Sequence, residues 1–261
     1  MIALLCALDL ELAHARGPLG AGMLEWDGPR AAAIGRVGEE PVALVVCGVG
    51  MLSAAAVTEW TIGRYRPRAV LNYGCAGAHR DDLMPGDLVI GERVVHYGSR
   101  RESKDGVVEY DGMRYLERGE PRRVDYLSAD PELLAAATRA AAALEKRHEP
   151  WPRELGWPDG VAHRPPRLVF GTVASADAWN RTRRSIEALV ARHGSLCEDM
   201  EAAAIAATCA SQDVPFLSIK DISNNELLRA TDSWTAVLGE VGEAQLARRA
   251  AVLAVETLRQ L

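Results

Sequence analysis

Segments typical of β-strands alternate with segments typical of helices along this chain, and this alternation limits the possible folds more than any other sequence feature. Apolar and β-branched runs predict strands at residues 2–7, 31–35, 42–47, 69–73, 87–95, 167–173 and 214–220. Helices are predicted at residues 51–65, 130–146, 182–192, 200–211 and from about 233 to 261. We therefore expect an α/β fold, with a twisted, mixed and mostly parallel sheet flanked by helices.

The length of 261 residues fits one domain with a sizeable core, which we assign to residues 1–261. Two segments interrupt the regular pattern. Residues 97–120 are charged and irregular, and indicate a loop or a small hairpin. Residues at about 148–166 are rich in Pro and Trp, and predict an irregular surface insertion that could border an active site.

The net charge of −6 disfavours nucleic acid and anionic membranes as partners, because both are negatively charged. No apolar run is long enough to span a bilayer. Residues 1–7 are apolar, but no basic segment precedes them and Asp9 and Glu11 follow, so they predict a strand rather than a signal peptide. The five cysteines have no CxxC spacing, which favours buried thiols, no metal site and a reducing, cytoplasmic location.

Residues that follow the predicted strands are the candidates for a ligand site, because α/β sheets bind ligands beyond the carboxyl ends of their strands. These positions are Glu11, residues 48–50, residues 72–77, residues 175–179, Met200, Glu201, Ser223 and Asn224. We expect them to lie along one rim of the sheet.

The sequence Asp199-Met200-Glu201 opens an alanine-rich helical run. Acidic residues at a helix start are favourable because the helix N-terminus carries partial positive charge, and this alone would explain both acids. Capping does not require an apolar side chain at Met200. A Met beside a Glu can instead pack on the face of a sugar while the carboxylate binds its hydroxyls. At this point both interpretations remain open.

Six segments, in order over nearly the whole chain, resemble the nucleoside phosphorylase/nucleosidase superfamily and are most similar to its methylthioadenosine/S-adenosylhomocysteine nucleosidases. They are ALDLE at 7–11, GVG at 48–50, NYGCAGA at 72–78, PGDLVI at 85–90, SADAW at 175–179 and DMEAAAIA at 199–206. The resemblance implies a purine nucleosidase that hydrolyses the N-glycosidic bond of a 5′-modified purine nucleoside. It further implies one nucleoside phosphorylase-like domain, no metal or organic cofactor and a homodimer.

The resemblance also implies a role for each matching position. Glu11 corresponds to the carboxylate that activates the attacking water, and a carboxylate can accept the proton that this water loses. Glu201 corresponds to the residue whose two oxygens bind the ribose 2′- and 3′-hydroxyls. Met200 packs on the sugar, Trp179 stacks on the purine, and Trp234 lies near the 5′-substituent. The other implied substrate-binding positions are Cys75, Ala76, Gly77, Asn180 and Ser223.

Asn224 is the second predicted catalytic residue, and it departs from the family pattern. In the nucleosidases the matching residue is an Asp that donates a proton to purine N7. An Asn cannot do this, although its amide donates an N–H and accepts from another group. That chemistry favours a 6-oxopurine, as in the futalosine hydrolases, over adenine. Asp221 is the other candidate acid, but strand alternation would turn it away from the Asn224 face.

Water is the predicted nucleophile, because the first loop, residues 8–12, is acidic and would repel phosphate. Asn72 and Cys75 stand where phosphorylases carry Arg and Ser. Arg80, Arg93 or an Arg of a neighbouring subunit could still bind phosphate, so a purine nucleoside phosphorylase remains an alternative.

Two further classes have weaker support. A binding protein that keeps the pocket and lacks catalysis is motivated by Asn224. Residues 48–53 resemble a dinucleotide-binding motif, but Ser53 replaces its third glycine, which disfavours a nicotinamide-dependent oxidoreductase.

Overall fold

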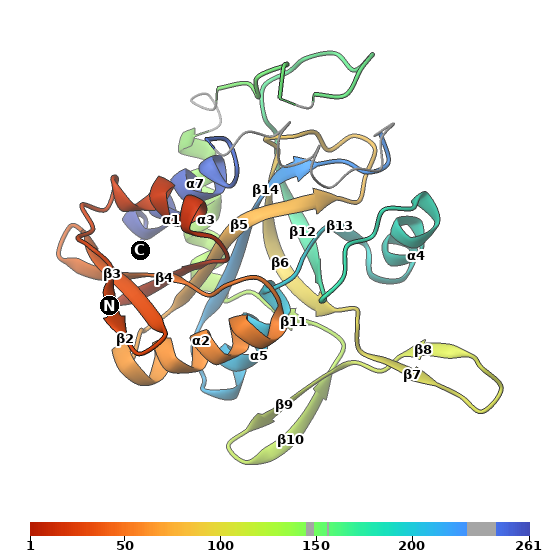
Figure 1. Ribbon diagram of the computed structural model, residues 1–261, viewed down its shortest axis with the longest axis horizontal. Coiled ribbons are helices and arrows are strands. Elements are labelled where there is room, and N and C mark those ends of the chain that lie inside the picture. The colour runs from red at the N-terminus through yellow and green to blue at the C-terminus, as the bar shows by residue number, and fades with distance from the viewer. Residues whose placement is uncertain (145–148, 156, 229–243) are drawn as a thin grey trace.

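A mixed sheet forms the centre of the computed structural model, which describes residues 1–144, 149–155, 157–228 and 244–261 (Figure 1). Within these residues the sheet has ten strands. They are β1 (Ile2–Cys6), β2 (Glu25–Asp27), β3 (Arg30–Val37), β4 (Glu40–Val46), β5 (Val70–Ala78), β6 (Leu88–His96), β11 (Leu127–Ser128), β12 (Leu168–Ser175), β13 (Ser195–Asp199) and β14 (Phe216–Asn224). Their order is β11-β6-β12-β13-β5-β1-β4-β3-β2, and β14 pairs with both β5 and β6.

Parallel and antiparallel pairings both contribute to this sheet. The parallel pairs are β1 with β4, β1 with β5, β14 with β5, β12 with β6 and β12 with β13. In the described residues, the antiparallel pairs of this sheet are β2 with β3, β3 with β4, β11 with β6, β13 with β5 and β14 with β6. The sheet is therefore mixed, as predicted, although its antiparallel share is larger than we expected. Part of that share comes from the tight turn that folds β3 directly back onto β4.

The strand β5 changes its neighbour along its length, and this change creates the site. On one side it pairs with β1 only as far as Asn72, and with β13 only from Gly77 onward. On its other side β14 runs beside it throughout. The residues of β5 between Asn72 and Gly77 therefore have no strand neighbour on one side, which leaves an opening near the carboxyl ends of β1, β5 and β14.

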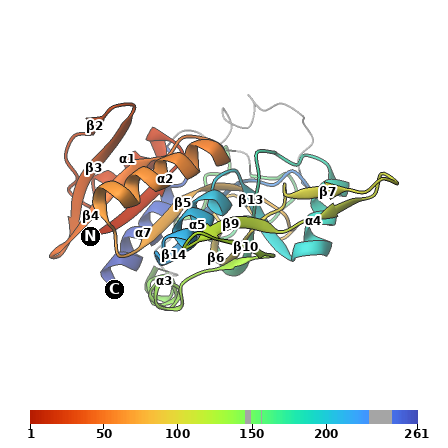
Figure 2. The ribbon, with the colours of Figure 1, turned by 90° about the horizontal axis from the view of Figure 1, so that it is seen from below.

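Helices cover both faces of the sheet. They are α1 (Asp9–Arg16), α2 (Met51–Tyr65), α3 (Pro131–Leu144), α4 (Arg183–His193), α5 (Ala202–Ser211) and α7 (Arg248–Arg259). Figures 1 and 2 show α1, α3 and α7 on one face, and α2 and α5 on the other. The first face packs Leu12, Leu133 and Leu253 into one core cluster, and the second packs Ala54 and Ile205 into another. Apolar residues buried on both faces hold the strand ends rigidly in place.

The described part of the predicted insertion, residues 149–155 and 157–166, forms no helix or strand. Trp151 is buried in a small apolar cluster against which Cys75 and Trp179 also pack, so the segment lies close to the opening beside β5. Arg164 donates from Nη1 to Oδ1 of the fully buried Asp87 at 2.6 Å. This ion pair fastens the segment to the loop that precedes β6.

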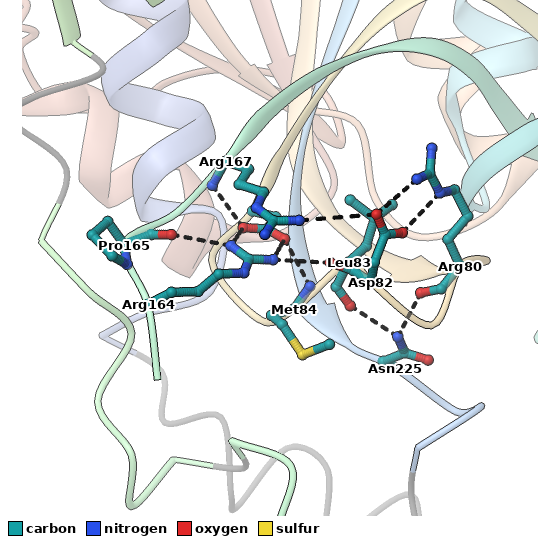
Figure 3. A network of polar contacts seen from close by, with 9 residues as sticks. Arg80, Asp82, Leu83, Met84, Arg164, Pro165, Arg167 and Asn225 are labelled. Atoms are coloured by element: carbon teal, nitrogen blue, oxygen red, sulfur yellow. Dashed lines mark hydrogen bonds and ion pairs between the residues drawn. The ribbon is translucent and has the colours of Figure 1, made fainter. Parts of the chain in front are cut away.

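The same loop is tied to the end of β14 by the polar network in Figure 3. Asp87 also accepts from the backbone N–H groups of Met84 and Arg167, at 2.8 and 2.7 Å. Asn225 donates from Nδ2 to the carbonyl oxygens of Arg80 and Leu83, both at 2.8 Å. The network therefore fixes the backbone at the carboxyl end of β14, where two predicted site residues lie.

Each predicted strand is present in the structure, but several elements were not predicted. The helix α1 and the strand β13 are eight and five residues long, too short to show a clear period. The small hairpin that was one of the two predictions for residues 97–120 is present as β7 (Arg100–Glu102) with β8 (Val108–Tyr110), and a second hairpin, β9 (Met113–Glu117) with β10 (Glu120–Val124), begins in this segment and extends beyond it. Of the predicted C-terminal helix, residues 233–243 lie outside the described part, and α7 begins at Arg248.

All five cysteines are free, and four of them are buried. The described residues contain no helix that is both long and apolar enough to cross a membrane.

Candidate active site

A cavity of about 350 Å³ lies in the opening beside β5. This volume falls in the range of sites that bind small molecules. Its walls come from the carboxyl ends of β1, β5, β13 and β14 and from the starts of α1 and α5. The predicted site residues that line it are Glu11, Cys75, Ala76, Gly77, Trp179, Met200, Glu201, Ser223 and Asn224. The strand ends therefore converge as the sequence predicted.

Glu11 lies in the first turn of α1, and its side chain is 99% buried at the cavity wall. Its Oε2 accepts from the backbone N–H groups of Ala7 and Leu8, at 2.9 and 3.1 Å. Its Oε1 accepts from the backbone N–H of Cys75 at 3.0 Å, a donor that β5 has free because no strand pairs with it there. Gly74 permits this approach, since a Cβ on it would lie 3.1 Å from Oε1. Three fixed donors thus stabilise the carboxylate and set its direction.

The acids before α5 take separate positions. Asp199 accepts from the backbone N–H of Ala202 at 2.9 Å and pairs with the buried ammonium of Lys220 at 2.7 Å. Glu201 turns into the cavity, where its Oε1 accepts from the backbone N–H of Gly50 at 2.8 Å. The favourable interaction of an acid with a helix N-terminus therefore explains Asp199 but not Glu201.

The pKa values of Glu201 and Lys220 depend on burial and on the charges around them. Burial raises the pKa of Glu201 to about 7, and the charge of Asp199 adds to the effect while Lys220 opposes it. Burial alone would lower the pKa of Lys220, but the Asp199 and Glu201 carboxylates outweigh it and raise that pKa above its ordinary value. Lys220 is thus a buried counter-ion for a cavity rich in carboxylates.

Asn224 ends β14, and its amide is held from both sides. Its Oδ1 accepts from Oγ of Ser223 at 2.8 Å, and its Nδ2 donates to Oε1 of Glu226 at 2.8 Å. Asp221 does not line the cavity; its Oδ2 accepts from the backbone N–H of Arg249 on α7 at 2.9 Å. The strand alternation that we invoked for Asp221 therefore matches the structure.

Glu198 is a cavity residue that the sequence reasoning missed. Its Oε1 accepts from the backbone N–H of Asn180 at 2.6 Å. Its Oε2 accepts from Nδ2 of Asn180 at 2.6 Å and from Oη of Tyr97 at 2.9 Å. Asn180, predicted as a substrate contact, is itself not part of the cavity wall and holds Glu198 instead.

The remaining predicted positions are Trp179, Met200 and Trp234. Trp179 is half-buried at the wall, with the guanidinium carbon of Arg181 5.1 Å from its ring centre. Met200 lines the cavity next to Glu201. Trp234 lies outside the described residues.

Lys220 is another cavity residue that the sequence reasoning missed, although the sequence indicated it. Lys220 ends the mostly apolar run 214–220, where a buried cation needs a partner and therefore indicates an ion pair. Glu198 had no such signal, because its place depends on the pairing of β13.

A model of the phosphorylase superfamily matches residues 2–259. The chain belongs to the phosphorylase superfamily. Among the curated members, this chain is 30% identical over 191 residues to the 5′-methylthioadenosine/S-adenosylhomocysteine nucleosidase of Geobacillus kaustophilus, across 73% of this chain and 69% of that protein. It is 25% identical over 244 residues to the protein of the same name from Mycobacterium bovis, across 93% of this chain and 91% of that protein.

Solved structures show that the superfamily fold extends over the whole chain. The Neisseria meningitidis 5′-methylthioadenosine/S-adenosylhomocysteine nucleosidase, in complex with methylthio-immucillin-A, has a TM-score of 0.77 and 23% identity, covering 100% of this chain and 99% of that one. The futalosine hydrolase of Helicobacter pylori has a TM-score of 0.76 and 17% identity, covering 100% and 97%. At these identities the comparison establishes a shared fold.

Proposed function

We propose that this chain is an N-glycosyl hydrolase that cleaves the glycosidic bond of a 5′-modified purine nucleoside. The observation that carries the proposal is one cavity in which Glu11, held by three backbone N–H groups, shares the wall with Glu201 and Met200. The relatives named as nucleosidases support the same chemistry.

In this proposal the ribose lies between Glu11 and Glu201. Glu201 accepts hydrogen bonds from the two ring hydroxyls while Met200 packs on the sugar face. As the bond from C1′ to the purine nitrogen lengthens, the ribose gains oxocarbenium character and negative charge develops on the purine. Glu11 takes a proton from the water that attacks C1′. Asn224 and Trp179 contact the departing base.

The charge of the cavity wall favours water over phosphate as the nucleophile. The wall includes the carboxylates Glu11, Glu198, Asp199 and Glu201. Lys220 is the one cation among the described wall residues, and Asp199 already pairs with it. A phosphate beside C1′ would therefore face uncompensated negative charge.

A base-release assay tests the function. The protein is incubated with 5′-methylthioadenosine, S-adenosylhomocysteine, inosine and futalosine, with and without phosphate, and the products are separated by chromatography. We expect a free purine and a free sugar at the same rate in both buffers. Release that requires phosphate and yields a sugar phosphate would instead show a phosphorylase. Tight binding without cleavage would show a binding protein.

We also propose the homodimer and the cytoplasmic location that the sequence predicts. Val49, which lines the cavity and is 55% exposed, and Leu52, which is 86% exposed, support an association surface beside the site. Light scattering on the purified protein measures the mass that decides the oligomeric state. The five free cysteines fit a reducing compartment.

A further inference from the structure

The helix α2 begins without a local N-terminal cap. Its N-cap residue is Gly50, which has no side chain to accept a hydrogen bond, and no acidic residue lies in its first turn. The first N–H groups of a helix have no partner within the helix, so they need an acceptor from elsewhere. Two carboxylates from distant parts of the chain provide it. Glu201 accepts from the backbone N–H of Gly50 at 2.8 Å. Asp177 accepts from the backbone N–H of Met51 at 2.7 Å.

Asp177 reaches α2 from the loop that follows β12. A Cβ on Gly50 would lie 2.9 Å from its Oδ1, so a residue with a side chain at position 50 would displace the carboxylate. The φ of Gly50, 96°, also favours glycine. Ser175, the last residue of β12, binds the start of α5, because its Oγ accepts from the backbone N–H of Ala203 at 3.2 Å. The end of β12 therefore fastens the starts of α2 and α5, the two helices that Glu201 joins.

The bond from Gly50 controls both the charge and the direction of the Glu201 carboxylate. Burial raises the pKa of Glu201 to about 7, and the Gly50 N–H opposes this by stabilising the ionised form. The charged groups that face it are Asp199, Lys220 and Glu11. Because the bond uses Oε1, it also directs Oε2, which can accept from the ribose hydroxyls. A shift of the start of α2 would weaken this bond.

We propose that Asp177 is a positioning residue for substrate binding: it fixes the start of α2, holds the Gly50 N–H on Glu201, and so keeps the ribose-binding carboxylate ionised and correctly directed. This inference rests on the proposed nucleosidase function and adds a residue that acts on the substrate through another. Asp177 is exposed and is not among the described residues that line the cavity. Because water reaches this position, variants of Asp177 should fold.

Two substitutions that remove the same charge separate positioning from electrostatics. Asp177→Asn keeps an oxygen that can accept from Met51, whereas Asp177→Ala removes the acceptor. Burial lowers the pKa of His96 and the Asp177 charge opposes this, but both variants lose that charge, so the effect cancels between them. We expect Asp177→Asn to stay within about threefold of the wild type, since Asn and Asp are equally good helix caps.

The Ala variant should differ from the Asn variant in two ways. Its KM should be about tenfold higher, since a hydrogen bond to a charged group weakens. The decrease of its kcat/KM at low pH should have an apparent pKa about one pH unit higher, because the ionised form of Glu201 loses a donor. Hydrogen exchange of the Gly50 amide, followed by NMR without substrate, should be faster in the Ala variant than in the Asn variant.

The kinetics use the nucleoside of the base-release panel that the wild type cleaves fastest. Asp105→Ala, which removes an exposed acid in the turn between β7 and β8, should behave like the wild type. Equal KM, pH profile and Gly50 exchange in the Asn and Ala variants would overturn the inference and leave the nucleosidase function in place. If the wild type cleaves no nucleoside, the proposed function is overturned, and Gly50 exchange alone decides whether Asp177 holds this bond. If Asp177→Ala does not fold, Asp177→Glu, which moves the carboxylate by one methylene, should raise KM relative to the wild type.

Discussion

Replacement of Glu11 by Gln isolates the proton-accepting step, because it keeps the size and most of the contacts of the side chain. Glu11 receives three backbone N–H bonds, two on Oε2 and one on Oε1. The carbonyl of Gln can take the place of Oε2 and keep the bonds from Ala7 and Leu8. Its NH₂ group then faces the N–H of Cys75, so a single hydrogen bond is lost.

The expected effects differ for stability and for catalysis. One buried N–H left without an acceptor costs about 1–3 kcal/mol, and this cost is partly offset because a negative charge near Glu201 disappears. The protein should therefore stay folded. Loss of a general base lowers kcat by about 10²- to 10⁴-fold. The charge of Glu11 also raises the pKa of Glu201, so that pKa should fall in the variant.

The assay follows purine release at saturating substrate, and urea unfolding measures the stability of the same preparations. Glu132→Gln, an exposed substitution in the first turn of α3, controls for the loss of one carboxylate. A Glu11→Gln variant that is folded and turns over within about tenfold of the wild type would refute the role of Glu11 as the base. A variant that loses both folding and activity would be replaced by Glu11→Asp, which keeps the charge and withdraws it from the cavity.

Three further outcomes follow from the charged groups. Glu201 must be ionised to accept hydrogen bonds from two hydroxyls, and burial raises its pKa to about 7, so kcat/KM should fall below pH 7 with an apparent pKa near 7. Glu201→Gln should abolish this decrease at low pH. A wild-type kcat/KM that stays constant from pH 5 to 8 would contradict the prediction. Burial raises the pKa of Asp221 from 3.8 to about 7, so the folded protein retains this proton after the unfolded chain has lost it. The free energy of unfolding should therefore decline as pH rises from about 4 to 7. Urea titrations at several pH values measure this decline, and Asp221→Asn should weaken it. If the free energy of unfolding of the variant falls with pH as steeply as that of the wild type, Asp221 does not cause the decline. Arg164→Ala leaves the Asp87 carboxylate buried with two backbone donors, and should lower the free energy of unfolding by about 2–4 kcal/mol. A loss below about 0.5 kcal/mol would mean that the Arg164–Asp87 ion pair in Figure 3 adds little to stability.

One part of the cavity wall could be predicted from sequence because its residues lie next to predicted strands and helices in a recognisable order. Glu11, Met200 and Glu201 each stand directly beyond or before an element whose pattern is clear, and ligand sites form at such ends. Their convergence needed only the fold class. The same reasoning explains why Asp221 was placed correctly on the other face of β14.

The place of Glu198 in the cavity wall could not be predicted in the same way. Glu198 reaches the cavity because β13 replaces β1 beside β5 at Gly77, and no local pattern encodes that switch. Asn180 was assigned by motif position, yet its side chain serves Glu198. These roles depend on register between strands far apart in sequence, which propensity and periodicity do not report.

The crowded carboxylates of the cavity explain how one wall can serve both binding and catalysis. Burial is the main cause of the raised pKa of Glu201, and repulsion from the charges of Asp199 and Glu11 adds to it despite the backbone donor and the nearby Lys220. This repulsion is a cost of the free protein. A neutral nucleoside relieves little of this repulsion when it binds. As the glycosidic bond breaks, the ribose becomes positively charged, and the same carboxylates then stabilise it. The interaction is stronger in the transition state than in the bound substrate, which is the condition for an increase in kcat rather than a decrease in KM. It follows that the charges of the wall are better understood as a preorganised counter-ion for the sugar than as individual substrate contacts.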